Sequence, residues 1–152
     1  MRRLTPTLLL AATLLLPGVA ARADDLPAGT IKSAKGNATI ERAGKQLPAQ
    51  TGAPLLASDH VLTGADGSVG IMLRDETLLS VGPNSNLWLE KFAFNPTTHD
   101  GVLNASVTRG TLAVISGKLS KQSPGAVQFR TPSSILGVRG TEFVIEVGDG
   151  AQ

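Results

Sequence analysis

Two histidines are the first candidates for chemistry in this sequence, because histidine titrates near neutral pH and binds metals. His60 and His99 lie 39 residues apart, and neither belongs to an HxH or HExxH pattern. A zinc site draws three or four ligands from tight clusters, which this spacing does not provide. Asp59-His60 could be part of a Ser-His-Asp triad, but no GxSxG motif places the serine. We therefore expect no enzyme, no metal site, no cofactor and no catalytic residue.

Adjacent carboxylates and the single tryptophan are the next candidates. Asp24-Asp25 and Asp75-Glu76 are neighbours in the sequence, and strand neighbours point to opposite faces. We interpret both pairs as solvated turn charges. Aromatic residues are 3% of the chain, so platforms for sugars or single-stranded nucleic acid are poorly supplied. We expect Trp88 in the core or on a sheet face rather than in a ligand platform.

The most distinctive segment is Thr131-Pro-Ser-Ser-Ile-Leu-Gly-Val-Arg-Gly-Thr141-Glu-Phe-Val. Pro132 fixes its own φ and keeps the preceding residue extended, which ends a strand sharply. Gly137 and Gly140 can adopt backbone conformations closed to other residues, and no helix follows them to cradle a phosphate. Between them, Arg139 either locks a corner of the fold, which we favour, or presents its guanidinium to a partner.

Short strands must position these residues. Apolar and other side chains alternate with period two in several runs, for example Val69, Ile71 and Leu73, and this is the period of a half-buried strand. Asp66-Gly67, between strands predicted at 61–63 and 68–73, indicates a hairpin with a type I′ turn. The run Gly82-Pro-Asn-Ser85 marks the next turn, between 77–81 and 86–92.

Glycines recur between the short apolar runs past residue 24, and we find no amphipathic helix there. We expect an all-β single domain of roughly ten to twelve short strands. A twisted β-solenoid or roll is the leading arrangement, and a β-sandwich is the alternative. We predict an exposed loop over residues 93–101 and a polar, mobile tail over residues 148–152.

The N-terminus has the three parts of a secretory signal peptide. Arg2 and Arg3 are cationic, residues 8–16 are apolar, and Ala21-Arg-Ala23 is an A-x-A cleavage site. The apolar run is too short to span a bilayer, which needs about 20 residues. We expect cleavage between Ala23 and Asp24, with residues 24–147 forming one domain in the periplasm or outside the cell. No stable membrane anchor should remain after cleavage.

Removal of this segment changes the charge balance. The whole chain has 14 basic and 12 acidic residues, but loss of Arg2, Arg3 and Arg22 leaves 11 against 12. The remaining basic residues form no cluster, whereas binding of nucleic acid needs clustered positive charge. We expect no nucleic-acid partner. The chain has no cysteine, which excludes disulfides and a cysteine-linked lipid anchor.

Four segments of the chain resemble the periplasmic FecR domain family. They are Gly36-Asn-Ala-Thr-Ile-Glu-Arg, the run from Leu55 to Val69, the run from Leu73 to Ser85, and the closing run from Thr131 to Val144. Ser58 and Glu76 stand where the family pattern has glycine. The closing run is the most specific, and its signature residues are Thr131, Pro132, Gly137, Val138, Arg139, Gly140, Thr141 and Phe143.

The resemblance implies an all-β, twisted, solenoid-like domain with a non-enzymatic role in signalling or protein contact at the cell envelope. The best-known relatives also have a cytoplasmic anti-sigma region, a transmembrane helix and often a receptor-contacting domain, and we recognise none of these here. We therefore expect a stand-alone soluble module that binds another envelope protein. A binder of cell-wall glycan or of a small ligand is the alternative.

Overall fold

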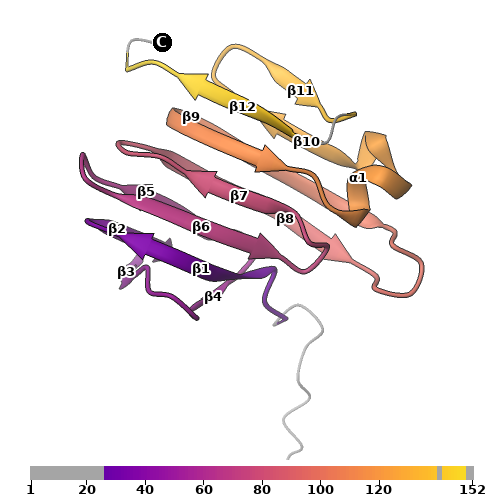
Figure 1. Ribbon diagram of the computed structural model, residues 1–152, viewed down its shortest axis with the longest axis horizontal. Coiled ribbons are helices and arrows are strands. Elements are labelled where there is room, and N and C mark those ends of the chain that lie inside the picture. The colour runs from indigo at the N-terminus through magenta and orange to yellow at the C-terminus, as the bar shows by residue number, and fades with distance from the viewer. Residues whose placement is uncertain (1–25, 140–141, 150–152) are drawn as a thin grey trace, which may run out of the picture.

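The computed structural model describes residues 26–139 and 142–149, which form twelve strands and two short helices (Figure 1). The elements are β1 (Gly29–Lys35), β2 (Ala38–Arg42), β3 (Lys45–Pro48), β4 (Pro54–Leu55), β5 (His60–Thr63), β6 (Ser68–Leu73), β7 (Leu78–Val81), β8 (Asn86–Phe94), β9 (Gly101–Ile115), α1 (Lys118–Gln122), the 3-10 helix η2 (Pro124–Ala126), β10 (Val127–Arg130), β11 (Ile135–Gly137) and β12 (Glu142–Val147). The helices of this part of the chain are too short to cross a membrane.

The strands form one sheet that folds over into two layers. Layer A runs β4-β1-β6-β7-β9-β12, and layer B runs β3-β2-β5-β8-β9-β10-β11. Strand β9 belongs to both layers: residues 101–109 pair with β8, and residues 110–115 pair with β7 and β12. All pairings are antiparallel except that of β9 with β10. This roll confirms the all-β prediction and its leading arrangement.

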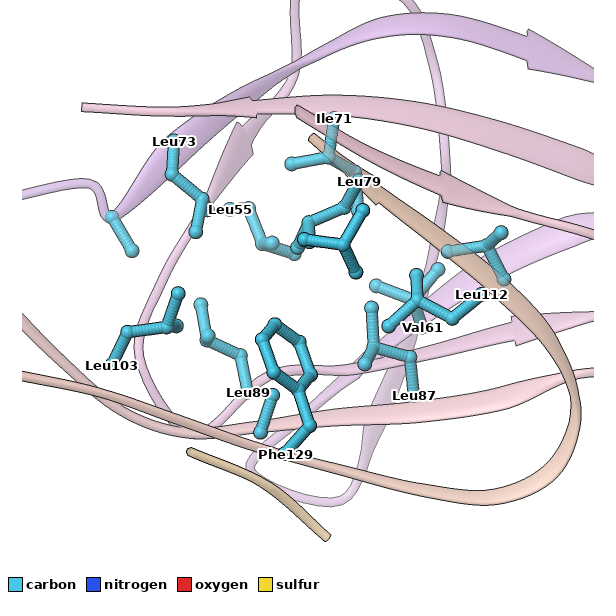
Figure 2. Close-up of a cluster of buried hydrophobic side chains, with 14 of the residues drawn as sticks. Leu55, Val61, Ile71, Leu73, Leu79, Leu87, Leu89, Leu103, Leu112 and Phe129 are labelled. Atoms are coloured by element: carbon cyan, nitrogen blue, oxygen red, sulfur yellow. The ribbon is translucent and has the colours of Figure 1, made fainter. Parts of the chain in front are cut away.

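The core lies between the two layers, where the inward side chains of both meet (Figure 2). In β6 the burial alternates as the sequence predicts, with Val69, Ile71 and Leu73 buried. Leu89 and Phe129 of layer B are also fully buried. Burial of each such side chain stabilises the fold by about 1.5–3 kcal/mol, so the core accounts for the closure of the roll.

The hairpin predicted at Asp66-Gly67 is wrong. Strands β5 and β6 have the expected bounds, but β5 pairs with β2 and β8, while β6 pairs with β1 and β7. A type I′ turn needs positive φ at both central residues, and neither Asp66 nor Gly67 has it. Glycine is required at position 67 for another reason: a Cβ there would lie 2.2 Å from the Asn37 carbonyl oxygen. The turn is an arch that carries the chain from layer B to layer A.

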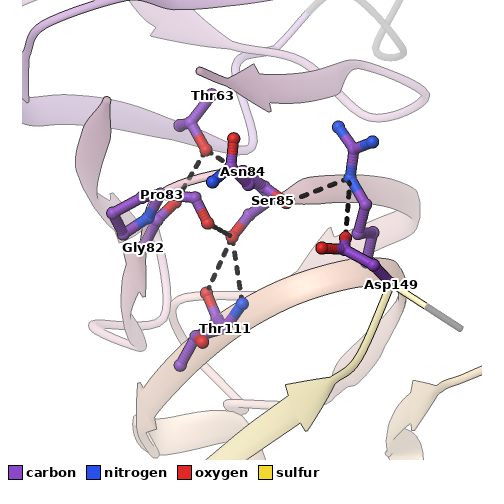
Figure 3. A network of polar contacts seen from close by, with 8 residues as sticks. Thr63, Gly82, Pro83, Asn84, Ser85, Thr111 and Asp149 are labelled. Atoms are coloured by element: carbon purple, nitrogen blue, oxygen red, sulfur yellow. Dashed lines mark hydrogen bonds and ion pairs between the residues drawn. The ribbon is translucent and has the colours of Figure 1, made fainter. Parts of the chain in front are cut away.

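The turn predicted at Gly82–Ser85 is present, and it is a second arch between the layers. Thr63 Oγ1 of the first arch donates to Gly82 O (2.6 Å) and accepts from Ser85 N (2.9 Å) (Figure 3). Ser85 Oγ in turn accepts from Thr111 N (3.0 Å), next to Gly110, where β9 crosses between the layers with φ +90°. Hydrogen bonds thus stack the arches at one end of the roll.

The opposite end of the roll departs from two expectations. The sequence predicts no amphipathic helix after the signal, and the short helix α1 is present; its five residues are too few to show a helical period. Asp75 is not a solvated charge, since it is fully buried and its carboxylate accepts from Thr77 N, Thr77 Oγ1 and Leu119 N. It holds the start of α1 against the β6–β7 turn. Glu76 is exposed as predicted, and Asp24-Asp25 lies outside the described residues.

Both positions where the resembled pattern has glycine carry positive φ. Ser58 has φ +74° and Glu76 has φ +69°. Glycine adopts this left-handed region without strain, whereas other residues do so at a cost. The substitutions therefore leave the turn shapes in place.

Candidate functional site

At the C-terminal side of the roll, each of the two layers ends in an edge strand. Among the described strands, β12 pairs only with β9, and β11 pairs only with β10. At the other end, β4 has two residues and β3 carries Lys45 and Pro48. Short strands, lysine and proline discourage pairing with another chain. The C-terminal edges are longer or more apolar, which makes them the better place for a partner.

A groove of about 360 Å³ runs between β11 and β12. It is lined by Leu136, Gly137, Val138, Arg139, Glu142, Phe143 and Val144. The groove contains one guanidinium and one carboxylate among apolar side chains and backbone. This composition suits a ligand that combines apolar groups with a few polar ones.

The core holds the base of the groove in place. The rings of Phe143 and buried Phe129 meet edge to face, with centroids 5.4 Å apart and planes at 74°. Val138 is buried, and its N–H donates to Val127 O (3.3 Å). Aromatic pairs of this geometry contribute about 0.5–1.5 kcal/mol beyond area burial, so the groove is attached to the core rather than to a loop.

Exposed apolar side chains surround the groove. Ile135 of β11 is 65% exposed and Val144 of β12 is 64% exposed. Leu136 and Ile115 are also exposed, and Ile115 lies opposite Glu142 in the β9–β12 register. Most of the large exposed hydrophobic side chains among residues 26–139 and 142–149 therefore gather at this end of the roll.

The signature residues fall into three groups. Gly137, Val138, Arg139 and Phe143 line the groove, while Gly140 and Thr141 lie outside the described residues. Thr131 and Pro132 are in the β10–β11 turn, where Thr131 N donates to Ser134 O (2.9 Å), and they do not line the groove.

Gly137 and Arg139 are both exposed where they line the groove. Gly137 has no positive φ, and a Cβ there would meet no atom within 4 Å. Arg139 is exposed, and no described residue forms a hydrogen bond or ion pair with its guanidinium. The structural role that we favoured for Arg139 stays a prediction, and its guanidinium is placed to reach a ligand in the groove.

The histidines form no reactive cluster. His60 stacks on Trp88 (centroids 5.1 Å apart) and His99 stacks on Phe94 (5.9 Å). Asp59 is buried and its carboxylate is held by Arg42, with distances of 2.8 Å from Nε and 2.7 Å from Nη2. The hydrogen bonding that Arg42 donates to the Asp59 carboxylate raises the pKa of Arg42. In residues 26–139 and 142–149, no three His, Cys, Asp or Glu side chains group as metal ligands.

The sequence reasoning identified the signature segment but not its apolar surroundings. Val144 shares the outward face of β12 with Glu142 and Glu146. An apolar residue on an otherwise charged face could have predicted the exposed apolar surface beside the groove. Trp88 is 39% exposed on the outer face of layer B. The sheet-face placement predicted for it is confirmed.

The sequence model of one protein family, described as FecR protein, matches residues 59–152. This match covers the groove and both of its strands. No curated protein and no solved structure matches the chain.

Proposed function

Because this chain belongs to the FecR family, we propose that its roll is a non-enzymatic binding module that takes part in signalling at the cell envelope. The proposal places the module in the periplasm, after removal of residues 1–23, where it binds another envelope protein. The observation that carries the proposal is the groove between β11 and β12, because the family signature and the exposed apolar side chains meet there.

The edge of β12 supports a specific mode of binding. An extended segment of a partner can pair with an edge strand through backbone hydrogen bonds, and alternate side chains then give specificity. Val144 would contact the outer face of such a segment, while Glu142 and Arg139 offer opposite charges at the groove. The protected edges of β3 and β4 make the same mode unfavourable at the other end.

Site-specific photo-crosslinking in the envelope tests this proposal. A photoreactive phenylalanine analogue replaces Val144 in one variant and Ser80, an exposed residue in the middle of β7, in the matched control. We expect one discrete protein adduct at position 144 and none at 80. The same adducts from positions 144 and 80, or no adduct from position 144, would contradict the proposal.

A charge at the edge gives a second readout of the same proposal. Val144→Lys adds a solvated charge to an exposed position, so it should not change the free energy of unfolding by more than about 0.5 kcal/mol. In this variant the photoreactive analogue replaces Ile135, an exposed residue of β11, because position 144 carries the lysine. The adduct from position 135 should be weaker than with Val144 in place, because lysine on an edge strand opposes pairing. Retention of the full adduct would argue against strand pairing.

Export has its own test. N-terminal sequencing of the protein from the periplasmic fraction should begin at Asp24, since Ala21-Arg-Ala23 supplies the cleavage site. Recovery of an intact Met1 terminus in the cytoplasm would contradict the placement in the envelope and leave the binding groove untouched.

A further inference from the structure

A row of side chains crosses the outer face of layer B and ends at Arg130, which directly precedes the signature segment. The register pairs His60 with Trp88, Trp88 with Ser106, and Ser106 with Arg130. The neighbours of these residues on each strand, such as Leu87, point into the core, so the row points outward. The four residues come from β5, β8, β9 and β10, four consecutive strands of layer B.

The indole ring in this row has one covered face and one open face. The His60 ring lies parallel to it, with an interplanar angle of 8° and centroids 5.1 Å apart. His60 is on the β5 side, so the other face of the indole is turned towards β9. There the residue in register is Ser106, whose small side chain can cover little of that face. This explains why the ring is 39% exposed although it sits in the middle of a sheet.

An acidic and a basic side chain border the open face of the indole. Ser106 Oγ donates a hydrogen bond to Glu90 Oε1, which fixes a hydroxyl and a carboxylate side by side. Arg130, exposed on the next strand, presents a guanidinium on the far side of Ser106. Adjacent strands are about 4.8 Å apart, so the indole and Arg130 are separated by about 10 Å across Ser106.

We propose that Trp88, Glu90, Ser106 and Arg130 form a carbohydrate-binding site for a glycan that bears a carboxylate. A pyranose has a flat face of C–H groups that packs on an aromatic ring, and Trp combines a large apolar surface with a polar N–H. Its hydroxyls hydrogen-bond to a carboxylate such as that of Glu90. A carboxylate on the sugar pairs with the planar fork of Arg130.

The charge of the row favours a sugar over a nucleobase, which also stacks on aromatic rings. Single-stranded nucleic acid needs a positively charged groove along its backbone. Here Glu90 and Glu41, which lies opposite His60, flank the stack with negative charge, and Arg130 is the cation in the row. A nucleic acid carries a phosphate at every nucleotide and would bring negative charge against both glutamates. A glycan with one carboxylate can place that charge at Arg130 and its neutral hydroxyls beside Glu90.

The intrinsic fluorescence of the protein tests the site directly, because Trp88 is the single tryptophan of the chain. The probes for the purified protein are the disaccharide of N-acetylglucosamine and N-acetylmuramic acid, neutral chitotetraose and a thymidine oligonucleotide. We expect a saturable change in emission and protection from acrylamide quenching with the acidic disaccharide. Chitotetraose should bind more weakly, and the oligonucleotide should have no effect.

Two variants and one control separate the site from the fold. Ser106→Ile places a large side chain over the open face and should abolish the change in emission. Arg130→Gln should weaken binding of the acidic disaccharide by about 10- to 150-fold, since hydrogen bonds to charged groups contribute about 1.5–3 kcal/mol. Ser80→Ile makes the same change on the outer face of layer A and should bind as the parent does.

Three outcomes would overturn the assignment. They are an unchanged emission with all probes at millimolar concentration, equal binding by Ser106→Ile and the parent, and binding of the oligonucleotide in place of the glycan. None of Trp88, Glu90, Ser106 and Arg130 lines the groove between β11 and β12, so these results leave the protein-binding proposal to its own tests.

Discussion

Ser58 and Glu76 show how single residues keep turns whose shape glycine would adopt more easily. Both have positive φ, and neither turn has opened. A buried carboxylate, that of Asp75, anchors the second of these turns through three hydrogen bonds. A residue other than glycine can therefore hold a strained backbone conformation where nearby side chains keep the turn in place.

Replacement of Ser58 by glycine should stabilise the protein. The Ser58 hydroxyl has no hydrogen bond to another described residue, and removal of the strain at φ +74° should raise the free energy of unfolding by about 0.5–1 kcal/mol. Urea denaturation followed by circular dichroism measures the change. Ser80→Gly is the matched control in a strand and should destabilise by a similar amount. A lower stability for Ser58→Gly would contradict the role of strain.

The contribution of Glu76 to stability depends on pH because of its ion pair with Lys118. Lys118 Nζ lies 2.7 Å from the Glu76 carboxylate, and this hydrogen bond, with the charge of Lys118, holds the pKa of Glu76 below its ordinary value. A carboxyl group with a lowered pKa stabilises the fold at pH values above its ordinary pKa, about 4.3. That contribution is lost as the pH falls through the lower, folded-state value.

Lys118→Gln should therefore return the pKa of Glu76 towards its ordinary value. A titration of the side-chain carboxyl by NMR measures it, and Lys45→Gln serves as a control on an unrelated strand. High salt should reduce the difference between parent and variant, because the pair is exposed. An unshifted titration in Lys118→Gln would show that another group sets the pKa.

The elements were easier to predict than their pairing. Alternation in runs such as 68–73 placed the strands, since the period of burial is local information. Asp66-Gly67 predicted a hairpin because the local signal of a turn does not say whether the next strand turns back beside its predecessor or crosses to the other layer. That choice depends on Asn37, 29 residues away, whose N–H binds the Asp66 carboxylate. The groove was likewise only partly predictable: its signature was visible, but the approach of β11 and β12 required the tertiary structure.

Gly110 tests the crossing of β9 between layers. It has φ +90°, and a Cβ there would lie 2.0 Å from Ser85 Oγ and 2.5 Å from Ser85 Cα. Gly110→Ala should lower the free energy of unfolding by at least about 3 kcal/mol, or prevent folding, because backbone strain and a backbone clash combine. Gly125→Ala, where a Cβ would meet nothing within 4 Å, is the control and should unfold as the parent does.

The two layers share both a core and a strand, so we expect residues 26–139 and 142–149 to unfold as one cooperative unit. Layer A without layer B would expose the side chains that Figure 2 shows between them. The division into layers is therefore not a division into domains. The domain bounds expected from the sequence stay a prediction.

Unfolding should proceed in a single transition that is the same for both layers. Trp88 reports on layer B, and a fluorescent label on Ser80→Cys reports on layer A, since the chain has no other cysteine. The two midpoints in urea should coincide, as two-state unfolding requires. Separate midpoints would show that one layer persists without the other.

The placement of β1 and β12 also determines how the roll would respond to force. They lie towards opposite ends of layer A, with β6, β7 and β9 between them. Tension between residues 26 and 149 therefore acts across the strands and opens their hydrogen bonds in sequence, like a zipper, instead of shearing many at once. We expect low unfolding forces when the protein is pulled from these positions, with β12 among the first strands to detach. Since β12 forms one wall of the groove, a pull on the chain would remove the binding surface before the rest of the roll is lost.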